Sequence, residues 1–421
     1  MEQSITDRML SFIDSSPSAF HVADNIKKEL EKAGFTELKE RDKWELGSGS
    51  YYVIRGESSV ISFRIPKRDF KGFHIIASHS DSPSFKIKEN PEMPGGAYVR
   101  LGSEKYGGML CAPWFDRPLS VAGRLVVSGG DEVKSLLVDV DRDLCMLPSL
   151  AIHMNREAND GYKYNAQRDM QPVFGDISSK ESFFTLVAEA AGVEAKDILS
   201  HDLFLYNRVK PTYWGANREF IASSRLDDQE CVFLTLTGLL DAEPVDYVSM
   251  HCVFDNEEVG SGTRQGADST FLKDTLKRIN ESLSRSMQEY HMAVADSFMI
   301  SADNAHAVHP SYEDKADPVN RPVMNGGIVI KYNANQKYTT DAVSAAQFKL
   351  LCKEAGVPFQ TFTNRSDMPG GSTLGNISTA HVSLNAVDIG LAQLAMHSPY
   401  ESAGARDPEY LSKVSRVFYS K

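Results

Sequence analysis

The stretch VSMHCVFDNEEVGSG, residues 248–262, joins an apolar run to two adjacent glutamates, Glu257 and Glu258. The apolar run is typical of a strand that is covered on both faces, as the strands of parallel sheets are. Two like charges side by side repel each other and are costly to bury, so the pair needs a function. The stretch predicts an α/β fold that carries functional carboxylates at the end of a buried strand.

Three further motifs have the same placement, directly after an apolar, strand-like run. They are His79-Ser80-Asp81 after FHIIAS, Asp227-Asp228 after FIASSRL and Asp303 after SFMISA. His397, in LAQLAMHSPYE, lies in the loop after the last expected strands and is a fifth candidate. Ligands of α/β proteins bind beyond the carboxyl ends of the strands, so we expect these side chains to lie close together.

This combination of imidazoles and carboxylates suits a pair of divalent metal ions. Such groups hold zinc at about 2.0–2.2 Å, and catalytic sites leave one coordination position open. Two ions about 3.5–4 Å apart need one carboxylate that contacts both, and Asp227 at a strand-to-helix corner suits this role. Asp81 can accept the second N–H of His79 and fix its tautomer. Zn²⁺ is the expected ion, although Co²⁺ or Mn²⁺ also binds such ligands.

The two glutamates then have separate tasks. One can bind metal while its neighbour accepts a proton from the attacking water. We assign Glu258 as the ligand and Glu257 as the general base; the spacing alone would also allow the reverse.

Composition excludes several classes of function. The net charge of −12 argues against sequence-independent binding to nucleic acid and against binding to an anionic membrane. The five cysteines are widely spread and lack CxxC spacing, which indicates reduced thiols. The first thirty or so residues lack the pattern of a signal peptide, and no run reaches the roughly eighteen apolar residues of a membrane helix. We therefore expect a cytoplasmic protein without nucleic-acid or membrane partners.

The chain of 421 residues exceeds the usual size of a single core, roughly 250–300 residues. Hairpins with Gly-Gly turns and a polar, irregular stretch predominate over residues 93–223, whereas α/β patterns precede and follow them. One long helix is expected over residues 266–290. The sequence predicts a discontinuous α/β domain, residues 1–92 and 224–421, with a β-rich domain inserted.

Eight blocks of sequence resemble the aspartyl aminopeptidase family of dinuclear zinc exopeptidases and follow the order of that family. They are ASHSDSPSFKIK, WFDRPLSVAGRL, LAIHMNRE, SSRLDDQE, DNEEVGSGTRQGA, SADNAHAVHP, SDMPGGSTLG and QLAMHSPYE. The resemblance extends from SAFHVADN to RVFYS. It implies a zinc-peptidase α/β/α catalytic domain, an inserted β-rich dimerisation domain, and dimers that assemble into a hollow tetrahedral dodecamer.

The resemblance also implies a role for each candidate residue. The implied ligands are His79, Asp227 and Asp303 for one ion, and Asp227, Glu258 and His397 for the other. Glu257 would be the general base and Asp81 the partner of His79. His153, in LAIHMNRE, would reach the site of a neighbouring subunit and help to stabilise the tetrahedral oxyanion, so an isolated monomer should be nearly inactive.

The implied substrates are peptides with a free N-terminus. Members of the family that prefer acidic residues use a lysine to receive the carboxylate of an N-terminal Asp or Glu. Lys331, in GIVIKYNANQKY, occupies that place, and Arg365 is a rival. Other relatives prefer neutral residues, so an aminopeptidase for neutral residues is the alternative.

Two other classes of protein share features with this chain. A dinuclear zinc carboxypeptidase or N-acyl amino acid deacylase has the same metal core. In those enzymes, however, the bridging aspartate closely follows the HxD motif, whereas here the long insertion separates His79 from Asp227. A catalytically silent shell protein would have lost a ligand or the base, and this chain has lost none.

Overall fold

The computed structural model describes residues 3–130 and 132–421, which fold as two compact units. The first unit contains Met1–Asp81, Pro211–Met396 and Glu401–Lys421, and the second contains Ser82–Lys210 and His397–Tyr400. The first unit is discontinuous. Its boundaries lie at residues 81 and 211, whereas 92 and 224 were expected from the sequence.

Strand pairing explains this difference in the boundaries. β5 (Ser84–Gly95) pairs with β10 (Ile198–Asn207) in the sheet of the second unit. β11 (Thr212–Trp214) and β12 (Phe220–Ser223) instead pair with each other, and β12 pairs with β20 (Glu401–Gly404) in the first unit. A strand belongs with the sheet to which it is hydrogen-bonded, and pairing over such separations is not visible in local sequence.

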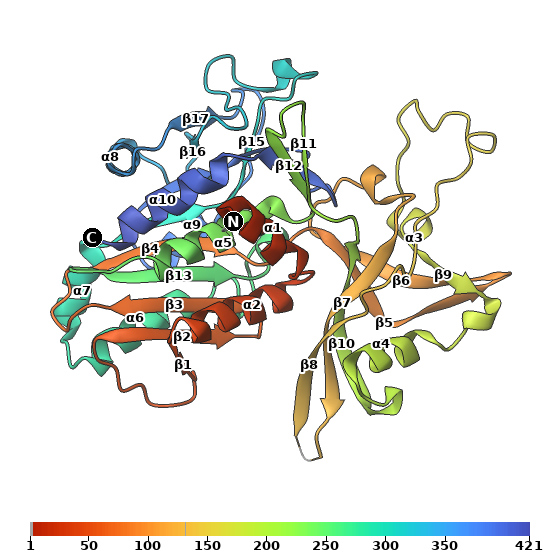
Figure 1. Ribbon diagram of the computed structural model, residues 1–421, viewed down its shortest axis with the longest axis horizontal. Helices are drawn as coiled ribbons and strands as arrows, with labels where there is room; N and C mark the ends of the chain where they lie inside the picture. Colours follow the sequence, from red (N-terminus) through yellow and green to blue (C-terminus); the bar gives the residue numbers. More distant parts are fainter. Residues whose placement is uncertain (1–2, 131) are drawn as a thin grey trace. The chain divides into compact units, whose positions relative to one another are not determined.

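The main sheet of the first unit has the strand order β1-β2-β3-β13-β4-β14-β18-β16-β17 (Figure 1). The strands are β1 (Thr36–Leu38), β2 (Gly49–Arg55), β3 (Ser59–Ile65), β4 (Phe73–His79), β13 (Val248–Phe254), β14 (Phe298–Ala302), β16 (Ile328–Tyr332), β17 (Phe359–Thr363) and β18 (Asn385–Gly390). β4 lies between β13 and β14 and is parallel to both. Phe254 is paired with His79, so the carboxyl ends of these strands meet at one edge of the sheet.

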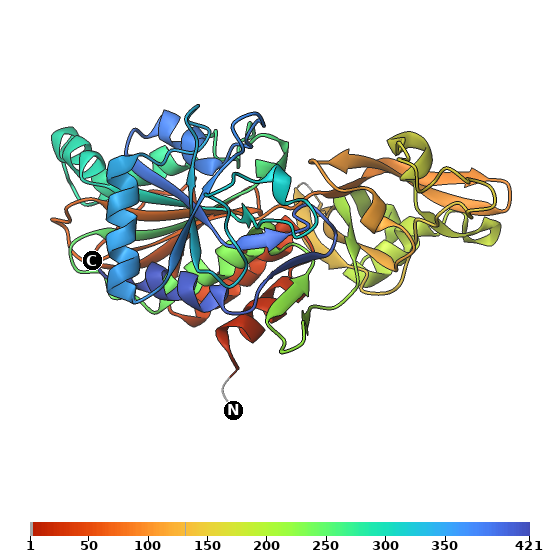
Figure 2. The ribbon, with the colours of Figure 1, turned by 90° about the horizontal axis from the view of Figure 1, so that it is seen from above.

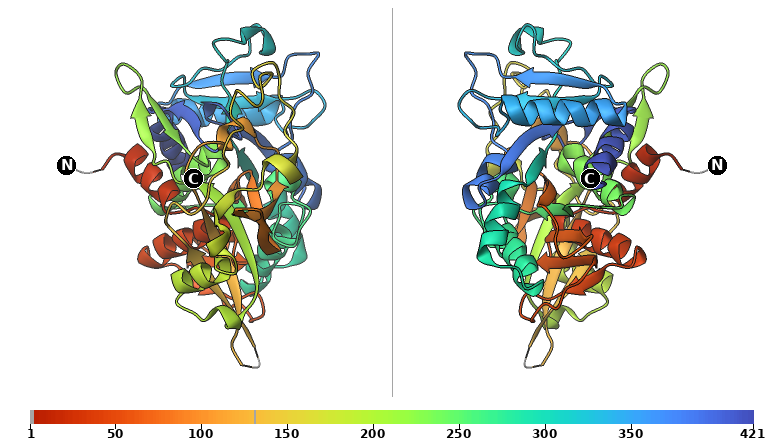
Figure 3. Two further views of the ribbon diagram at one scale, coloured as in Figure 1. Left: turned by 90° about the vertical axis from the view of Figure 1, so that its right-hand side faces the viewer. Right: turned by 90° about the vertical axis from the view of Figure 1, so that its left-hand side faces the viewer.

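Helices cover both faces of this sheet, as Figures 2 and 3 show. One layer contains α1 (Ile5–Asp14), α2 (Ala19–Lys32), α5 (Leu226–Leu240), α8 (Ala342–Ala355) and α10 (Asp407–Tyr419), and the other contains α6 (Phe271–Ser282), α7 (Met287–Ala295) and α9 (Leu374–His381). Ile76 packs with the first layer, whereas Ile75 and Ala77 pack with the second, because successive side chains of a strand point to opposite faces. The α/β/α expectation is confirmed.

The long helix expected over residues 266–290 is wrong, because two helices occupy this segment. α6 ends at Ser282, and Ser284 has a φ of 54°, which interrupts the helix. Ser286 then caps α7: its hydroxyl accepts the Glu289 N–H at 3.2 Å, and the Glu289 carboxylate accepts the Ser286 N–H at 2.7 Å. This capping box was the sequence signal of a new helix start, and apolar periodicity alone did not reveal it.

The second unit is built on an antiparallel sheet with the order β8-β7-β10-β5-β6-β9. Its remaining strands are β6 (Tyr98–Tyr106), β7 (Leu119–Ser128), β8 (Val133–Asp139) and β9 (Val173–Asp176), and its helices include α3 (Ala166–Asp169) and α4 (Phe183–Ala191). The β5–β6 hairpin turns at Gly95-Gly96, where Gly96 has a φ of 62°. The β-rich character is as expected.

A small sheet completes the first unit, with the order β11-β12-β20-β19-β15. β15 (Ala305–His306) and β19 (Ala392–Leu394) continue the chain beyond β14 and β18 respectively. Backbone hydrogen bonds join the two connections, from Asp303 N–H to Ile389 carbonyl at 3.1 Å and from Ala305 N–H to Leu391 carbonyl at 2.8 Å. Residues 303–305 are thus hydrogen-bonded along their length to residues 389–391.

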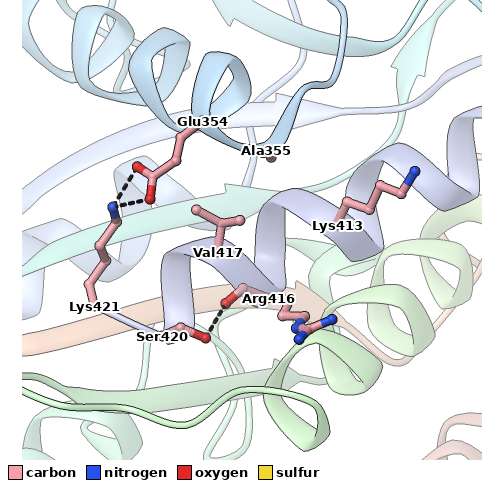
Figure 4. Close-up of a pocket in the computed structure, with 7 residues that line it drawn as sticks. All are labelled: Glu354, Ala355, Lys413, Arg416, Val417, Ser420 and Lys421. Carbon is pink, nitrogen blue, oxygen red and sulfur yellow. Dashed lines mark hydrogen bonds and ion pairs between the residues drawn. The ribbon is translucent and has the colours of Figure 1, made fainter.

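The end of the chain is fixed to α8 by an ion pair (Figure 4). Lys421 Nζ lies 2.6 and 2.5 Å from the two carboxylate oxygens of Glu354. The surface pocket beside this pair is lined by Glu354, Ala355, Lys413, Arg416, Val417, Ser420 and Lys421. None of the predicted site residues lines it, so this pocket is separate from the candidate site.

All five cysteines are free thiols, and four of them are buried. Across residues 3–130 and 132–421, none of the helices combines the length and apolar character that crossing a bilayer requires.

His74, in β4, is a buried histidine whose protonation opposes folding. Its Nδ1 lies 3.0 Å from the Phe418 carbonyl oxygen, and its ring stacks on Tyr247 and Phe418 at centroid distances of 3.9 and 4.4 Å. Burial lowers the pKa of His74 to about 4. The folded state therefore favours the neutral imidazole.

We expect His74→Phe to flatten the acid dependence of stability. The pKa is about 6.5 when unfolded and about 4 when folded, so this contribution is intact above pH 6.5 and is lost as the pH falls towards 4. Between pH 7.5 and pH 5 the wild-type protein should lose about 2 kcal/mol from this histidine, and the variant should not. Urea unfolding at both pH values measures the difference. His291→Phe, at an exposed position of α7, is the matched control, and equal acid dependence in all three proteins would refute the prediction.

Candidate metal centre

Three predicted ligands meet at the carboxyl edge of the main sheet. His79 ends β4, Asp227 lies in the irregular first turn of α5, and Asp303 directly follows β14. One ligand atom from each lies within 4.8 Å of the others, and His79 Nε2 is 3.5 Å from Asp227 Oδ1. All three side chains are buried. The structure brings these residues together, although they are separated by about 150 and 75 positions in the chain.

The glutamate pair lies beside the same histidine. His79, Glu257 and Glu258 form a second group whose ligand atoms lie within 4.8 Å of one another. Asn256 precedes the pair with a φ of 63°, a conformation that asparagine adopts more readily than most residues. Its side-chain oxygen accepts hydrogen bonds from Thr263 at 2.8 Å and Gln265 at 3.0 Å. The chain thus turns sharply after β13 and presents both glutamates at the edge.

Asp81 contacts both halves of this arrangement. His79 Nδ1 lies 3.1 Å from the backbone carbonyl oxygen of Asp81 and 3.4 Å from its Oδ1. The two carboxylate oxygens of Asp81 also accept the backbone N–H groups of Glu257 and Glu258, each at 3.1 Å. This second role is not visible in the local sequence, because residues 176 and 177 positions apart make the contacts. Asp81 therefore orients the imidazole and holds the turn that carries the glutamates.

Two further buried carboxylates support the predicted ligands. Asp228 Oδ2 accepts a hydrogen bond from the backbone N–H of His79 at 3.2 Å, and Glu401 Oε2 accepts one from the backbone N–H of Asp227 at 3.0 Å. Asp228 had no role predicted from the sequence, and Glu401 was not among the candidates. The Asp-Asp pair was a signal for the first, whereas nothing local distinguishes the second.

The buried acids raise each other's proton affinity. Burial, followed by nearby carboxylates, raises the pKa of Glu257 to about 7. Burial also raises the pKa of Asp303, and it raises that of Asp228 well above its usual range. A divalent ion would add positive charge to this cluster of acids, and imidazole nitrogen with carboxylate oxygen is the donor set that zinc takes. The residues present therefore fit a metal ion.

Lys331, in β16, lies at this cluster. Its Nζ is 3.6 Å from Asp303 Oδ2 and 5.5 Å from the centre of the Tyr338 ring, and the side chain is buried. The rival, Arg365, is only partly buried and pairs with Asp367 at 2.7 Å. Of the two candidates for a substrate carboxylate, Lys331 is the one next to a predicted ligand.

His397 and His153 belong to the segments of the second unit. His397 has a φ of 66°, and its Nδ1 lies 2.7 Å from the Gly108 carbonyl oxygen. His153 is exposed in a turn of the segment that precedes α3. Their roles as ligand and oxyanion donor stay predictions.

Comparison with known proteins identifies the family. A model of the family described as Aminopeptidase I zinc metalloprotease (M18) matches residues 12–419. The chain belongs to the M18 aminopeptidase family. Aspartyl aminopeptidase is a member of M18, so the resemblance noted in the sequence is confirmed at the level of the family. As an M18 protein, the chain is a metallopeptidase that hydrolyses peptide bonds.

Relatives of similar length support this assignment. The chain is 45% identical over 429 residues to a probable M18 family aminopeptidase 2 of Clostridium acetobutylicum, covering 100% of this chain and 99% of the relative. It is 40% identical over 432 residues to a protein of the same description from Pseudomonas aeruginosa, with the same coverage.

Solved M18 structures share the fold. The structure described as the Ape4 and Nbr1 complex matches with a TM-score of 0.96 and 34% identity, covering 99% of this chain and 85% of that one. The Saccharomyces cerevisiae mApe1 dodecamer matches with a TM-score of 0.87 and 29% identity, covering 99% and 96%. The M18 aminopeptidase from Thermotoga maritima, at 23% identity and a TM-score of 0.88 over 99% and 95%, shares the fold.

Proposed function

We propose that this M18 protein is a two-metal aminopeptidase that removes the N-terminal residue of peptides with a free amine. The observation that carries the proposal is the buried cluster of His79, Asp227 and Asp303 beside the Glu257-Glu258 pair. The proposed ligands are His79, Asp227 and Asp303 for one ion, and Asp227, Glu258 and His397 for the other. Zn²⁺ is the proposed ion, because the matching family is one of zinc metalloproteases.

The residues of the chain then have distinct tasks in the reaction. Bound divalent ions would polarise the scissile carbonyl and acidify the attacking water. Glu257 takes the proton from that water and returns it to the leaving amine. Asp81 holds the Glu257 backbone and the His79 ring, so base and ligand keep a fixed separation. His153 of a neighbouring subunit donates to the oxyanion.

Metal analysis of protein purified without chelator, together with peptide cleavage, tests the proposal. We expect two ions per chain and cleavage of peptides only when their N-terminal amine is free. Cleavage of N-acetylated substrates would favour the deacylase alternative. Protein that binds no metal and cleaves no peptide would favour the silent shell protein.

We propose further that the enzyme prefers acidic N-terminal residues and that Lys331 receives their side-chain carboxylate. Lys331→Met should lower kcat/KM about 10²-fold for Asp- and Glu-peptides and less than about threefold for Leu-peptides, because only acidic substrates have a side-chain carboxylate that pairs with Lys331. Metal content is measured in parallel, since Lys331 lies beside Asp303. Arg365→Met is the control and should leave kcat/KM unchanged for all three kinds of peptide. An equal loss for all three substrates would assign Lys331 to the support of Asp303 alone.

Self-association is the remaining part of the proposal. The yeast relative is described as a dodecamer, and we propose dimers that assemble into a tetrahedral dodecamer here. Leu150, Ile152 and Met154 are exposed by 56%, 49% and 74%, and a second copy would cover such apolar side chains. Light scattering should give the mass of twelve chains, and a stable, fully active monomer would refute the proposal.

The free thiols suit a reducing compartment, so we place the protein in the cytoplasm.

A further inference from the structure

A cluster of buried polar side chains lies next to the segments that carry Asp227 and Asp303. Its members are Glu230 on α5, Asn304 after β14 and Gln393 on β19, and we call it the Asn304 cluster. They are exposed by 0%, 2% and 1%. The mechanism proposed above uses none of them, and burying polar groups costs free energy unless they are hydrogen-bonded.

Asn304 connects several backbone segments through one side chain. Its Nδ2 lies 3.1 Å from the Leu226 carbonyl oxygen, 3.0 Å from Glu230 Oε2 and 3.2 Å from Gln393 Oε1. Its Oδ1 accepts the Leu391 N–H at 3.3 Å. Asn304 directly follows Asp303, and Leu226 directly precedes Asp227. One side chain thus links the backbones of two predicted ligands and the β18–β19 connection.

Glu230 anchors this link from the second turn of α5. No lysine, arginine or histidine in the described part of the chain forms an ion pair with it, and burial raises its pKa to about 8. A glutamine at this position would have the same shape and would keep a side-chain oxygen that accepts the hydrogen bond from Asn304 Nδ2. An apolar residue would be expected at a position so fully buried, since an unpaired carboxyl group is costly there. We therefore explain the carboxyl group of Glu230 by a role in orienting the Asn304 side chain.

We propose that Asn304 and Glu230 are positioning residues that set the separation between Asp227 and Asp303 and thereby the affinity for metal. The inference rests on the metal site of the proposed function. Neither residue touches the substrate. Both act through the backbones that carry the ligands, as the hydrogen-bonded partners of metal ligands do in other metalloproteins.

Three substitutions and one matched control test the inference. Asn304→Ala and Glu230→Met remove the link, whereas Glu230→Gln keeps it. Thr235→Val is the control: Thr235 lies on the same helix, is exposed by 0%, and its hydroxyl donates to the backbone carbonyl of Cys231 at 2.7 Å. For each protein the affinity for Zn²⁺ is measured by competition with a chromogenic chelator, the melting temperature without metal, and kcat and KM with saturating metal.

We expect Asn304→Ala and Glu230→Met to weaken Zn²⁺ binding 10- to 100-fold, the range seen for partners of metal ligands. Glu230→Gln should remain within about threefold of wild type, and Thr235→Val should bind metal normally even where its melting temperature falls. With saturating metal, the two disruptive variants should lose kcat more than they change KM. If Asn304→Ala does not fold, the two Glu230 variants decide.

Two results would overturn the inference: one concerns the Asn304 cluster alone, and the other concerns the proposed metal site itself. Wild-type affinity in Asn304→Ala and Glu230→Met, with melting temperatures lowered as in Thr235→Val, would assign the cluster to core stability alone. If the wild-type protein bound no Zn²⁺ in the same assay, the proposed metal site would be refuted, and the inference that rests on it would be refuted too.

Discussion

Glu257→Gln should retain both metal ions and lose turnover by 10²- to 10⁴-fold, the usual contribution of general acid–base transfer. Glutamine has the shape of glutamate but accepts no proton from the attacking water. The turn that carries residue 257 should persist, because Asp81 holds it through backbone N–H groups that the substitution leaves in place. Metal content and kcat, measured on the same preparation, give the result.

Asp227→Ala is the counterpart, because it removes the carboxylate proposed to contact both ions. We expect this variant to lose metal as well as turnover. Equal metal loss in Glu257→Gln and Asp227→Ala would overturn the division between base and ligand. If Glu258→Gln kept its metal and Glu257→Gln lost it, the roles of the two glutamates would be reversed, which the spacing of the pair also allows.

Gly390→Ala should be strongly damaging although residue 390 is not one of the proposed ligands. A Cβ at residue 390 would lie 2.1 Å from the Asp303 carbonyl oxygen and 3.0 Å from the Asn304 Cα and carbonyl carbon. These are backbone atoms of the segment that carries a predicted ligand, so that segment must move. We expect a loss of about 3 kcal/mol in unfolding free energy and at least about 10²-fold in kcat/KM.

Urea unfolding and peptide kinetics measure both effects. Gly47→Ala is the control, since a Cβ there meets no heavy atom within 4 Å. Its stability and activity should stay close to those of wild type. A Gly390→Ala protein that matched this control would show that β18 can move away from Asp303 at little cost.

Much of the candidate site could be predicted from short stretches of sequence. FHIIAS, SMHCVF and SFMISA are apolar runs, and an apolar run of this length forms a strand that both helix layers cover. Parallel strands end at the same edge of a sheet, so His79, Asp303 and the Glu257-Glu258 pair were expected to be neighbours. Placement after a strand was enough for this conclusion, because it depends on strand direction and not on the details of packing.

The orientation of these groups depended on contacts between distant residues. Asp81 reaches the glutamate turn across 176 positions, Asn304 reaches Glu230 across 74, and Lys331 lies beside Asp303. Such contacts require a particular strand order, register and side-chain packing, and local patterns carry no information on any of the three. Hydrophobic periodicity determines which segments form strands and helices; only the assembled sheet determines which buried acid accepts a hydrogen bond from which backbone, because that depends on distances of a few tenths of an ångström.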